Sequence, residues 1–394
     1  MQGVAAVVEW EIFTGRAGVK PSKRLTPSHP TLNTHNRARC ARGHGMAAWN
    51  KWRHWAGSLA ALLLATATAQ GQTAIPVPGP TVTAIKARGA LACGVDTGIP
   101  GFAFQDSKGV WHGFDVAYCR AIAAAVLGDP EKVRYIPTTT PARFTMLQAG
   151  EIDVLIRDST MTLTRSVQLH LDEVAVNFYA GQGFLVSKKL GVSKITELNG
   201  ATICTLTGAT LELNIADFAR ANGTKIGTLL FEKSDEATAA MEAGRCDGYT
   251  DDTGSLAAVR STLKIPTDWL VLEGVISKEP LGIHIRSGDV TWRNIVFWVD
   301  AALKQAEETG VTKANADEMV KTTKDPAIKR LLGAEGGFGA LLGLDNDWTL
   351  RAIKAAGNYG EIYDEFFGPK ALDLARGQNK LWNAGGLQYS LPFR

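Results

Sequence analysis

An eight-residue stretch, DSTMTLTR at 158–165, brings together the groups that bind small charged molecules. It offers the carboxylate of Asp158, four hydroxyl groups and, at its end, the guanidinium of Arg165. A guanidinium presents a planar fork of N–H donors that matches a carboxylate, so Arg165 is a candidate to hold an anionic group. The alternative is a surface or salt-bridging arginine, and the stretch alone does not decide between the two.

Two further polar stretches supply complementary groups. TGAT at 207–210 comes directly before a helical pattern, where free backbone N–H groups and the Thr210 hydroxyl suit an anion. DDT at 251–253 contains Asp252, whose carboxylate suits an ammonium group. Each has an ordinary alternative, because TGAT could be a simple strand-to-helix turn and Asp252 could cap the helix that follows. One cation and one anion around a cleft is what a zwitterion requires.

The apolar pattern predicts the elements that position the arginine stretch. A first β-α-β-α-β unit has its strands and helices at 90–95, 115–128, 133–138, 141–150 and 152–156. The strands are too apolar to face water, which favours a parallel sheet covered by helices. The arginine stretch follows the last strand, and ligands of open parallel sheets bind beyond the carboxyl ends of the strands.

A second α/β unit repeats this order without an obvious sequence repeat. Its expected strands lie at 201–206, 227–232 and 246–252, with helices between and after them. TGAT and DDT each lie at the end of one of these strands. The joint placement of the three polar stretches, rather than any one of them, favours a shared ligand site. After residue 283 the pattern becomes mostly helical, beginning with an amphipathic helix at 289–310.

Length and composition exclude several classes of protein. The chain has 394 residues, which suits two domains, and its 45% apolar and 21% charged residues are typical of a globular protein. A net charge of +3 is too small to predict a nucleic-acid partner. No CxxC pair occurs and the histidines do not cluster with cysteines, so we expect no metal site and no cofactor.

The N-terminal region has the sequence pattern of an export signal. From Met46 the sequence has a basic start, a short apolar core and small residues, which predict a secretory signal peptide at 46–69 that is cleaved near Ala69. The apolar run is too short for a permanent membrane anchor. Residues 1–45 are either a mis-assigned start, which we favour, or a leader, and the Pro/Gly-rich segment 70–82 is expected to be a tether.

Six stretches carry a family resemblance: RGALACGVDTGIPGFAFQDSKGVWHGFDVAYCRAIAAAVLGD, RFTMLQAGEIDVLIRDSTMTLTR, YAGQGFLVSKKLGV, AGRCDGYTDDTGSLAA, ISKEPLG and NKLWNAGGLQYSLPFR. Over nearly the whole mature chain, the sequence resembles the periplasmic solute-binding proteins of polar amino acid ABC transporters (solute-binding protein family 3). It is most similar to their general L-amino acid-binding branch. The resemblance implies an α/β, two-lobed periplasmic-binding-protein fold of type II, with a mostly parallel sheet and helices on both faces in each lobe. Lobe 1 would comprise 83–181 and 283–394, including a helical C-terminal extension, and lobe 2 would comprise 182–282, with hinge crossings near 182–185 and 276–282.

The resemblance also implies a ligand site between the lobes. Arg165 would grip the α-carboxylate of an amino acid, with Asp158 and Thr160 as neighbours. From the second lobe, Thr210 would add a contact and Asp252 would take the α-ammonium.

The resemblance further bears on ligand range. Narrower family members carry an aromatic platform near positions that are here Ile99 and Thr139, so this pocket is expected to accept many side chains. Phe102 is a candidate for one wall, with a role in the core as the alternative. Arg157 is charged where many relatives carry a small residue, and it would either meet an acidic side chain or shape the cleft.

Four cysteines remain once the signal region is removed, and four cysteines allow three pairings. An exported protein favours disulfides over free thiols, which are the alternative. By the lobes that the resemblance implies, Cys93 and Cys119 belong to the first lobe, and Cys204 and Cys246 to the second. Bonds between the lobes would oppose hinge closure, so we expect Cys204–Cys246 and Cys93–Cys119.

The resemblance therefore implies a periplasmic binding protein and not an enzyme. It would act as a monomer that captures free L-amino acids and delivers them to an inner-membrane ABC permease. The main alternative is an enzyme on the same scaffold, similar to cyclohexadienyl or arogenate dehydratase. Such an enzyme needs a general acid or base, and the candidates are Glu212, Asp251 (unless it simply faces solvent) and His284. A third possibility is a sensor domain that reports to a receptor.

Overall fold

The computed structural model describes residues 78–394, so the leader at 1–45, the signal peptide at 46–69 and most of the tether lie outside the described residues. The fold begins with helix α1 (Pro80–Arg88), which starts before the expected boundary at Thr83. The predicted tether was too long because proline is accommodated in the first turn of a helix, where no N–H donor is needed. Within the described residues, no helix is both long and apolar enough to cross a membrane.

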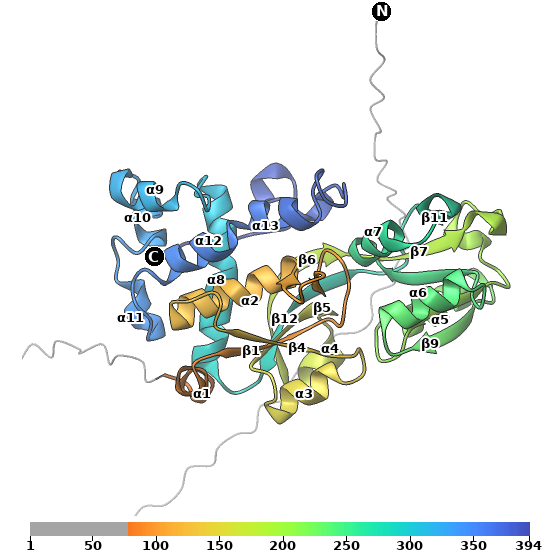
Figure 1. Cartoon of the computed structure of the whole chain (residues 1–394), viewed down its shortest axis with the longest axis horizontal. Helices are drawn as coiled ribbons and strands as arrows, with labels where there is room; N and C mark the ends of the chain where they lie inside the picture. Colours follow the sequence, from red (N-terminus) through yellow and green to blue (C-terminus); the bar gives the residue numbers. More distant parts are fainter. Residues whose placement is uncertain (1–77) are drawn as a thin grey trace, which may run out of the picture. The chain divides into compact units, whose positions relative to one another are not determined.

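The first sheet combines parallel and antiparallel strands. In spatial order, its strands are β4 (Val133–Pro137), β1 (Leu91–Val95), β5 (Val154–Thr160), β12 (Glu279–Arg286) and β6 (Leu171–Ala180). β1 pairs in parallel with β4 and β5, whereas β12 runs antiparallel to β5 and β6 (Figure 1). The parallel part is the predicted β-α-β-α-β unit, and the antiparallel strands are those next to the hinge crossings.

Helices cover both faces of this sheet because its inner strands point successive side chains to opposite faces. Ile156 packs in the main core with residues of α2 (Phe114–Leu127) and α8 (Val290–Glu308). Leu155, its neighbour on β5, belongs to a separate cluster with residues of α3 (Arg143–Ala149). A fully buried strand of this kind explains the continuous apolar run in the sequence.

The C-terminal extension is helical and packs on the first lobe. Its helices are α9 (Ala316–Thr322), α10 (Pro326–Leu331), α11 (Phe338–Leu342), α12 (Trp348–Ala356) and α13 (Tyr359–Phe366). α12 lies along α2, where the Arg351 guanidinium donates to the carbonyl oxygens of Ala124 and Ala125. The tail then returns to the end of β6, where the Asn379 side chain accepts from the N–H of Tyr179 and donates to its carbonyl oxygen.

The second sheet repeats the plan of the first. In spatial order, its strands are β11 (Trp269–Val271), β7 (Gln182–Ser187), β10 (Gly248–Asp252), β8 (Thr202–Leu206) and β9 (Gly227–Phe231), and its helices are α5 (Leu211–Asn222), α6 (Ser234–Glu242) and α7 (Thr253–Thr262). β8 pairs in parallel with β9 and β10, and β7 runs antiparallel to β10 and β11. Leu185 packs with residues of α6 and α7, whereas Phe184 packs with Ile215 of α5, so helices again cover both faces.

The chain passes between the two sheets twice. β6 gives way to β7 at Gly181, and β11 leads into β12 across 272–278. The two crossings touch each other, since the Ile276 N–H donates to the Gln182 carbonyl oxygen at 2.9 Å. A Cβ atom at Gly181 would lie 2.8 Å from the Ser277 carbonyl oxygen, so this close approach requires glycine.

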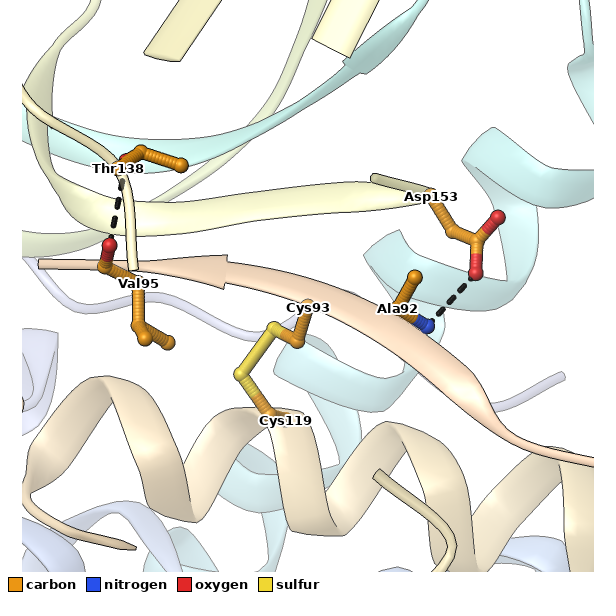
Figure 2. Close-up of a disulfide and its surroundings, with 6 residues drawn as sticks. All are labelled: Ala92, Cys93, Val95, Cys119, Thr138 and Asp153. Atoms are coloured by element: carbon orange, nitrogen blue, oxygen red, sulfur yellow. Dashed lines mark hydrogen bonds between the residues drawn. A yellow bond between two sulfur atoms is a disulfide. The ribbon is translucent and has the colours of Figure 1, made fainter. Parts of the chain in front are cut away.

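Each lobe contains one disulfide. Cys93 of β1 is bonded to Cys119 of α2 (Figure 2), and their Cα atoms are 6.2 Å apart. Cys204 of β8 is bonded to Cys246, which precedes β10, with Cα atoms 5.6 Å apart. This is the pairing that the resemblance implies, and neither bond connects the two lobes.

Candidate functional site

The strand ends of the two sheets meet at a pocket of about 30 Å³. Six of the seven residues predicted to bind ligand line it: Arg157, Asp158, Thr160, Arg165, Thr210 and Asp252. The first lobe contributes β5 and the turn that follows it, and the second lobe contributes the end of β10 and the start of α5. The structure therefore brings the three polar stretches together, as their positions at strand ends predict.

A bulge in β5 presents both Arg157 and Asp158 to the pocket. The strand runs to Thr160, beyond the predicted end at Ile156. Its pairing with β12 jumps from Ser159 to Ile156, which leaves Arg157 and Asp158 outside the ladder. Neighbours on a regular strand point to opposite faces, whereas a bulge re-aims them. Asp158 also has a left-handed φ of 31°, a conformation that costs a non-glycine residue about 1–3 kcal/mol.

Arg165 offers a charged group without a carboxylate partner. It lies on the short helix α4 (Leu163–Val167), which Thr162 caps by accepting the Arg165 backbone N–H at 3.2 Å. The buried guanidinium lies 4.7 Å from the Phe144 ring centroid and donates to the Thr160 carbonyl oxygen at 2.5 Å. Within 78–394, no carboxylate lies within ion-pair distance of it. Burial lowers the pKa of Arg165 to about 10, so the group stays protonated at neutral pH.

A second guanidinium, that of Arg143, was not predicted from the sequence. Arg143 begins α3, is 2% exposed and lines the pocket, where it lies 4.5 Å from the same Phe144 ring as Arg165. Its N–H groups reach only carbonyl oxygens, including that of Gly208 in the second lobe at 3.4 Å, and its Nε atom has no partner. Burial, and then the nearby guanidinium groups of Arg157 and Arg165, lower the pKa of Arg143 well below its usual range.

Arg157 differs from these two because its guanidinium is fully engaged. It forms an ion pair with Asp96, lies 3.3 Å from the Asp158 carboxylate, and donates to the Thr138 carbonyl oxygen at 3.1 Å and the Thr140 hydroxyl at 3.0 Å. Of the two roles expected for Arg157, this set of partners favours that of shaping the cleft.

Three carboxylates face one another across the pocket. Asp158 comes from the first lobe, Asp251 and Asp252 come from the second, and one oxygen of each lies within 4.8 Å of the others. Burial is the main cause that raises the pKa of each carboxyl group, and for Asp252 it reaches about 7, with Asp158 as the second cause. Such a cluster attracts a cation.

The two aspartates of the second lobe are held by the protein. Asp252 caps α7, since its carboxylate accepts from the Gly254 N–H at 2.8 Å and the Ser255 N–H at 3.1 Å. The helix-cap alternative is therefore correct, and the same carboxylate lines the pocket. Asp251 accepts a hydrogen bond from the Tyr249 hydroxyl and is 5% exposed, so the alternative that it faces solvent is wrong.

Glu279 is a further pocket residue that was not singled out in the sequence. It is the first residue of β12, is 2% exposed and accepts hydrogen bonds from Thr160, Thr210, Asn214 and Ser277. The motif ISKEPLG marked the crossing, but nothing in it indicates a buried carboxylate. Because the Thr160 and Thr210 hydroxyls donate to Glu279, each can only accept a hydrogen bond from a ligand.

The remaining predicted residues lie elsewhere. Phe102 is fully buried in an aromatic cluster of the first lobe with Phe114, Phe178 and Phe367, and it is not among the residues that line the pocket. Of the enzyme candidates, Glu212 and His284 do not line the pocket either. Burial lowers the pKa of His284 to about 3, so this imidazole is neutral at physiological pH.

Comparison with known proteins gives consistent matches. The family described as bacterial extracellular solute-binding proteins, family 3, matches residues 91–322. The chain is 51% identical over 315 residues to the glutamate/glutamine/aspartate/asparagine-binding protein of Rhodobacter capsulatus, covering 80% of this chain and 93% of that protein. It is 49% identical over 317 residues to the general L-amino acid-binding periplasmic protein of Rhizobium johnstonii, with the same coverage of 80% and 93%.

A solved structure agrees with the fold. The ABC transporter/periplasmic binding protein from Brucella ovis, solved with glutathione bound, superposes with a TM-score of 0.78 at 50% identity. The match covers 80% of this chain and 99% of that one, and thus includes both sheets and the C-terminal extension.

Proposed function

Because the chain belongs to the bacterial extracellular solute-binding proteins, family 3, we propose that it captures L-amino acids between its two lobes and delivers them to an ABC transporter permease. One observation carries the proposal. Around a single pocket, the first lobe presents the unpaired guanidinium of Arg165 and the second lobe presents the carboxylate of Asp252. An amino acid zwitterion carries the complement of both groups.

The charges assign a role to each group. Arg165 binds the α-carboxylate, because its N–H donors are only partly used by the Thr160 carbonyl oxygen. Asp252, with Asp158 across the pocket, binds the α-ammonium, which relieves the repulsion among the three close carboxylates. The Thr210 hydroxyl donates to Glu279, so a carboxylate would receive hydrogen bonds here from backbone N–H groups near the start of α5.

Arg143 points to ligands with a second oxygen-rich group. Two like charges, Arg143 and Arg165, lie over the same Phe144 ring without a carboxylate between them, so an anion there would be attracted by both. With the α-carboxylate on Arg165, a side-chain carboxylate or amide oxygen is the group that suits Arg143. The name of the Rhodobacter relative, which includes glutamate and aspartate, supports this class of ligand.

Binding is coupled to closure of the lobes. Arg165 and Asp158 lie in the first lobe, whereas Asp252 lies in the second, so a ligand makes its full set of contacts only when the lobes are closed. The closed form is then the one that docks on the permease.

The test is isothermal titration calorimetry with alanine, leucine and glutamate. Arg165→Ala and Asp252→Ala should each weaken the binding of all three at least a hundredfold, because loss of one partner of a buried charge pair costs about 3–5 kcal/mol. Arg120→Ala and Asp217→Ala, which change more exposed residues of the two lobes, serve as matched controls with unaltered affinity. Near-normal binding by either pocket variant contradicts the proposal.

A periplasmic location and a monomeric state complete the proposal. The name of the Rhizobium relative includes the word periplasmic, and the predicted signal peptide ends near Ala69. N-terminal sequencing of the exported protein should find a start close to Gln70. The dehydratase alternative would require turnover of a prephenate-like substrate, whereas a binding protein leaves such a substrate unchanged.

A further inference from the structure

The Glu279 carboxylate links the two lobes of the molecule. Glu279 opens β12, at the point where the second crossing enters the first sheet, and its backbone pairs with Ala180 of β6. We propose that Glu279 is an interlobe bridge, a positioning residue that favours the closed form whatever side chain the ligand carries. This inference rests on the proposed binding function and concerns how the site closes.

The hydrogen bonds come from three parts of the chain. One carboxylate oxygen accepts from the Thr160 hydroxyl of the first lobe and from the Thr210 hydroxyl of the second lobe, the latter at 2.9 Å. The other oxygen accepts from the Asn214 side-chain amide of the second lobe at 2.7 Å and from the Ser277 hydroxyl of the crossing at 2.5 Å. Hydrogen bonds to a buried carboxylate are charge-assisted and thus stronger than neutral ones.

Glu279 is not a competitor of the ligand for Arg165. Within the described part of the chain, no arginine or lysine lies within ion-pair distance of its carboxylate. Four polar donors from uncharged side chains satisfy the charge instead. The guanidinium of Arg165 therefore remains available for a ligand while Glu279 holds the hydroxyls.

Opening of the lobes must break part of this set. Thr160 lies at the end of β5 in the first sheet, whereas Thr210 and Asn214 lie at the start of α5 in the second lobe. A rotation about the crossings would move Thr160 away from Thr210 and Asn214. The Glu279 carboxylate is attached to β12 and cannot remain hydrogen-bonded to the donors of both lobes. The closed form alone satisfies all four bonds, so Glu279 lowers the free energy of the closed form relative to the open one.

A nearly isosteric change tests this directly. The carboxylate accepts on both oxygens, whereas the amide of Glu279→Gln must turn an NH₂ group toward one pair of donors. The variant keeps the volume and removes the charge and half of the acceptor capacity. The apparent affinity is proportional to the fraction of the protein that can adopt the closed form. We therefore expect the Kd of every ligand to rise by the same factor, about tenfold to a hundredfold.

The donors supply a matched pair of variants. Asn214→Ala removes a donor of the second lobe, and Ser277→Ala removes one within the crossing. Both delete one hydrogen bond to the same oxygen, but only the first bond spans the lobes. Asn214→Ala should therefore weaken binding more than Ser277→Ala does.

The experiment combines calorimetry with small-angle X-ray scattering. Glu279→Gln is titrated with alanine, leucine and glutamate, and its radius of gyration is measured with and without saturating ligand, after circular dichroism has verified the fold. We expect equal losses of affinity, a larger radius than that of the unaltered protein in the absence of ligand, and the same radius at saturation. A higher affinity would mean that the Glu279 carboxylate competes with the ligand. A loss confined to one ligand would mean that Glu279 contacts that ligand's side chain. Either result overturns the proposed interlobe bridge. If the unaltered protein binds no amino acid, the proposed function fails, while the scattering without ligand still decides on the bridge.

Discussion

We expect ligand affinity to depend on pH because of the three carboxyl groups of Asp158, Asp251 and Asp252. In the folded protein, burial and the facing Asp158 raise the pKa of Asp252 from 3.8 to about 7, a difference of about 4 kcal/mol at 1.36 kcal/mol per pH unit. The contribution of Asp252 to the free energy of unfolding is thus fully present below about pH 4 and is lost as the pH rises through 7. An ammonium group in the pocket stabilises the ionised form of Asp252 and thereby offsets the free energy that its ionisation costs the folded protein.

The sign of the effect on binding follows from this. Below pH 7, the ligand must displace a proton from the cluster of Asp158, Asp251 and Asp252, whereas above pH 7 Asp252 is already ionised. For one displaced proton, affinity falls about tenfold per pH unit, which makes Kd about a hundredfold higher at pH 5 than at pH 7. The pKa of the neighbouring Arg157 guanidinium is raised by its contacts with carboxylates, so this group adds no titration of its own.

The assay is calorimetric titration with alanine between pH 5 and pH 8, in two buffers with different enthalpies of protonation. Near pH 6, we expect release of up to one proton per bound ligand, and above pH 8 almost none. Asp217→Asn, at an exposed position of the second lobe, should keep the same profile. An affinity that is constant over this range, or higher at pH 5, refutes the reasoning.

Three further predictions concern single residues. Arg143→Gln should weaken the binding of glutamate at least tenfold more than that of alanine, because a buried guanidinium with a free Nε suits a second carboxylate; equal losses in competition calorimetry argue against this. Replacing Cys204 and Cys246 by serine should lower the free energy of unfolding in urea by about 2–4 kcal/mol, and an unchanged urea midpoint contradicts a disulfide there. Phe102→Ala should lower the free energy of unfolding by about 3–5 kcal/mol, as expected of a ring in the core. A free energy of unfolding within about 1 kcal/mol of that of the unaltered protein would contradict this role and favour a contact with the ligand.

The sequence carried enough information to find most of the pocket. Apolar strands followed by short polar stretches are a local pattern, and the rule that ligands bind at the carboxyl ends of parallel strands converted three such stretches into one site. Arg165, Thr210 and Asp252 were located in this way, and the structure places all three around the same pocket.

For two residues the sequence left two readings open, and only the packing of the folded chain decided between them. Phe102 was a candidate for one wall of the pocket, with a role in the core as the alternative. Its ring packs against Phe178 and against Phe367 of the C-terminal extension, so it belongs to the core. Asp251 was either a candidate acid or base or a residue that faces solvent, and the strand places it against Tyr249 in the interior.

The order of strands and helices and the kinds of charge available to a ligand were thus determined by the sequence itself, since periodicity and side-chain chemistry are local properties. Which charges are paired was decided only by the tertiary structure. Arg157 is neutralised by Asp96, whereas Arg143 and Arg165 keep no carboxylate partner within the described chain. A bulge and a crossing likewise bring Asp158 and Glu279 into the site. Pairing depends on distances of a few ångströms between segments far apart in sequence, and folding alone sets those distances.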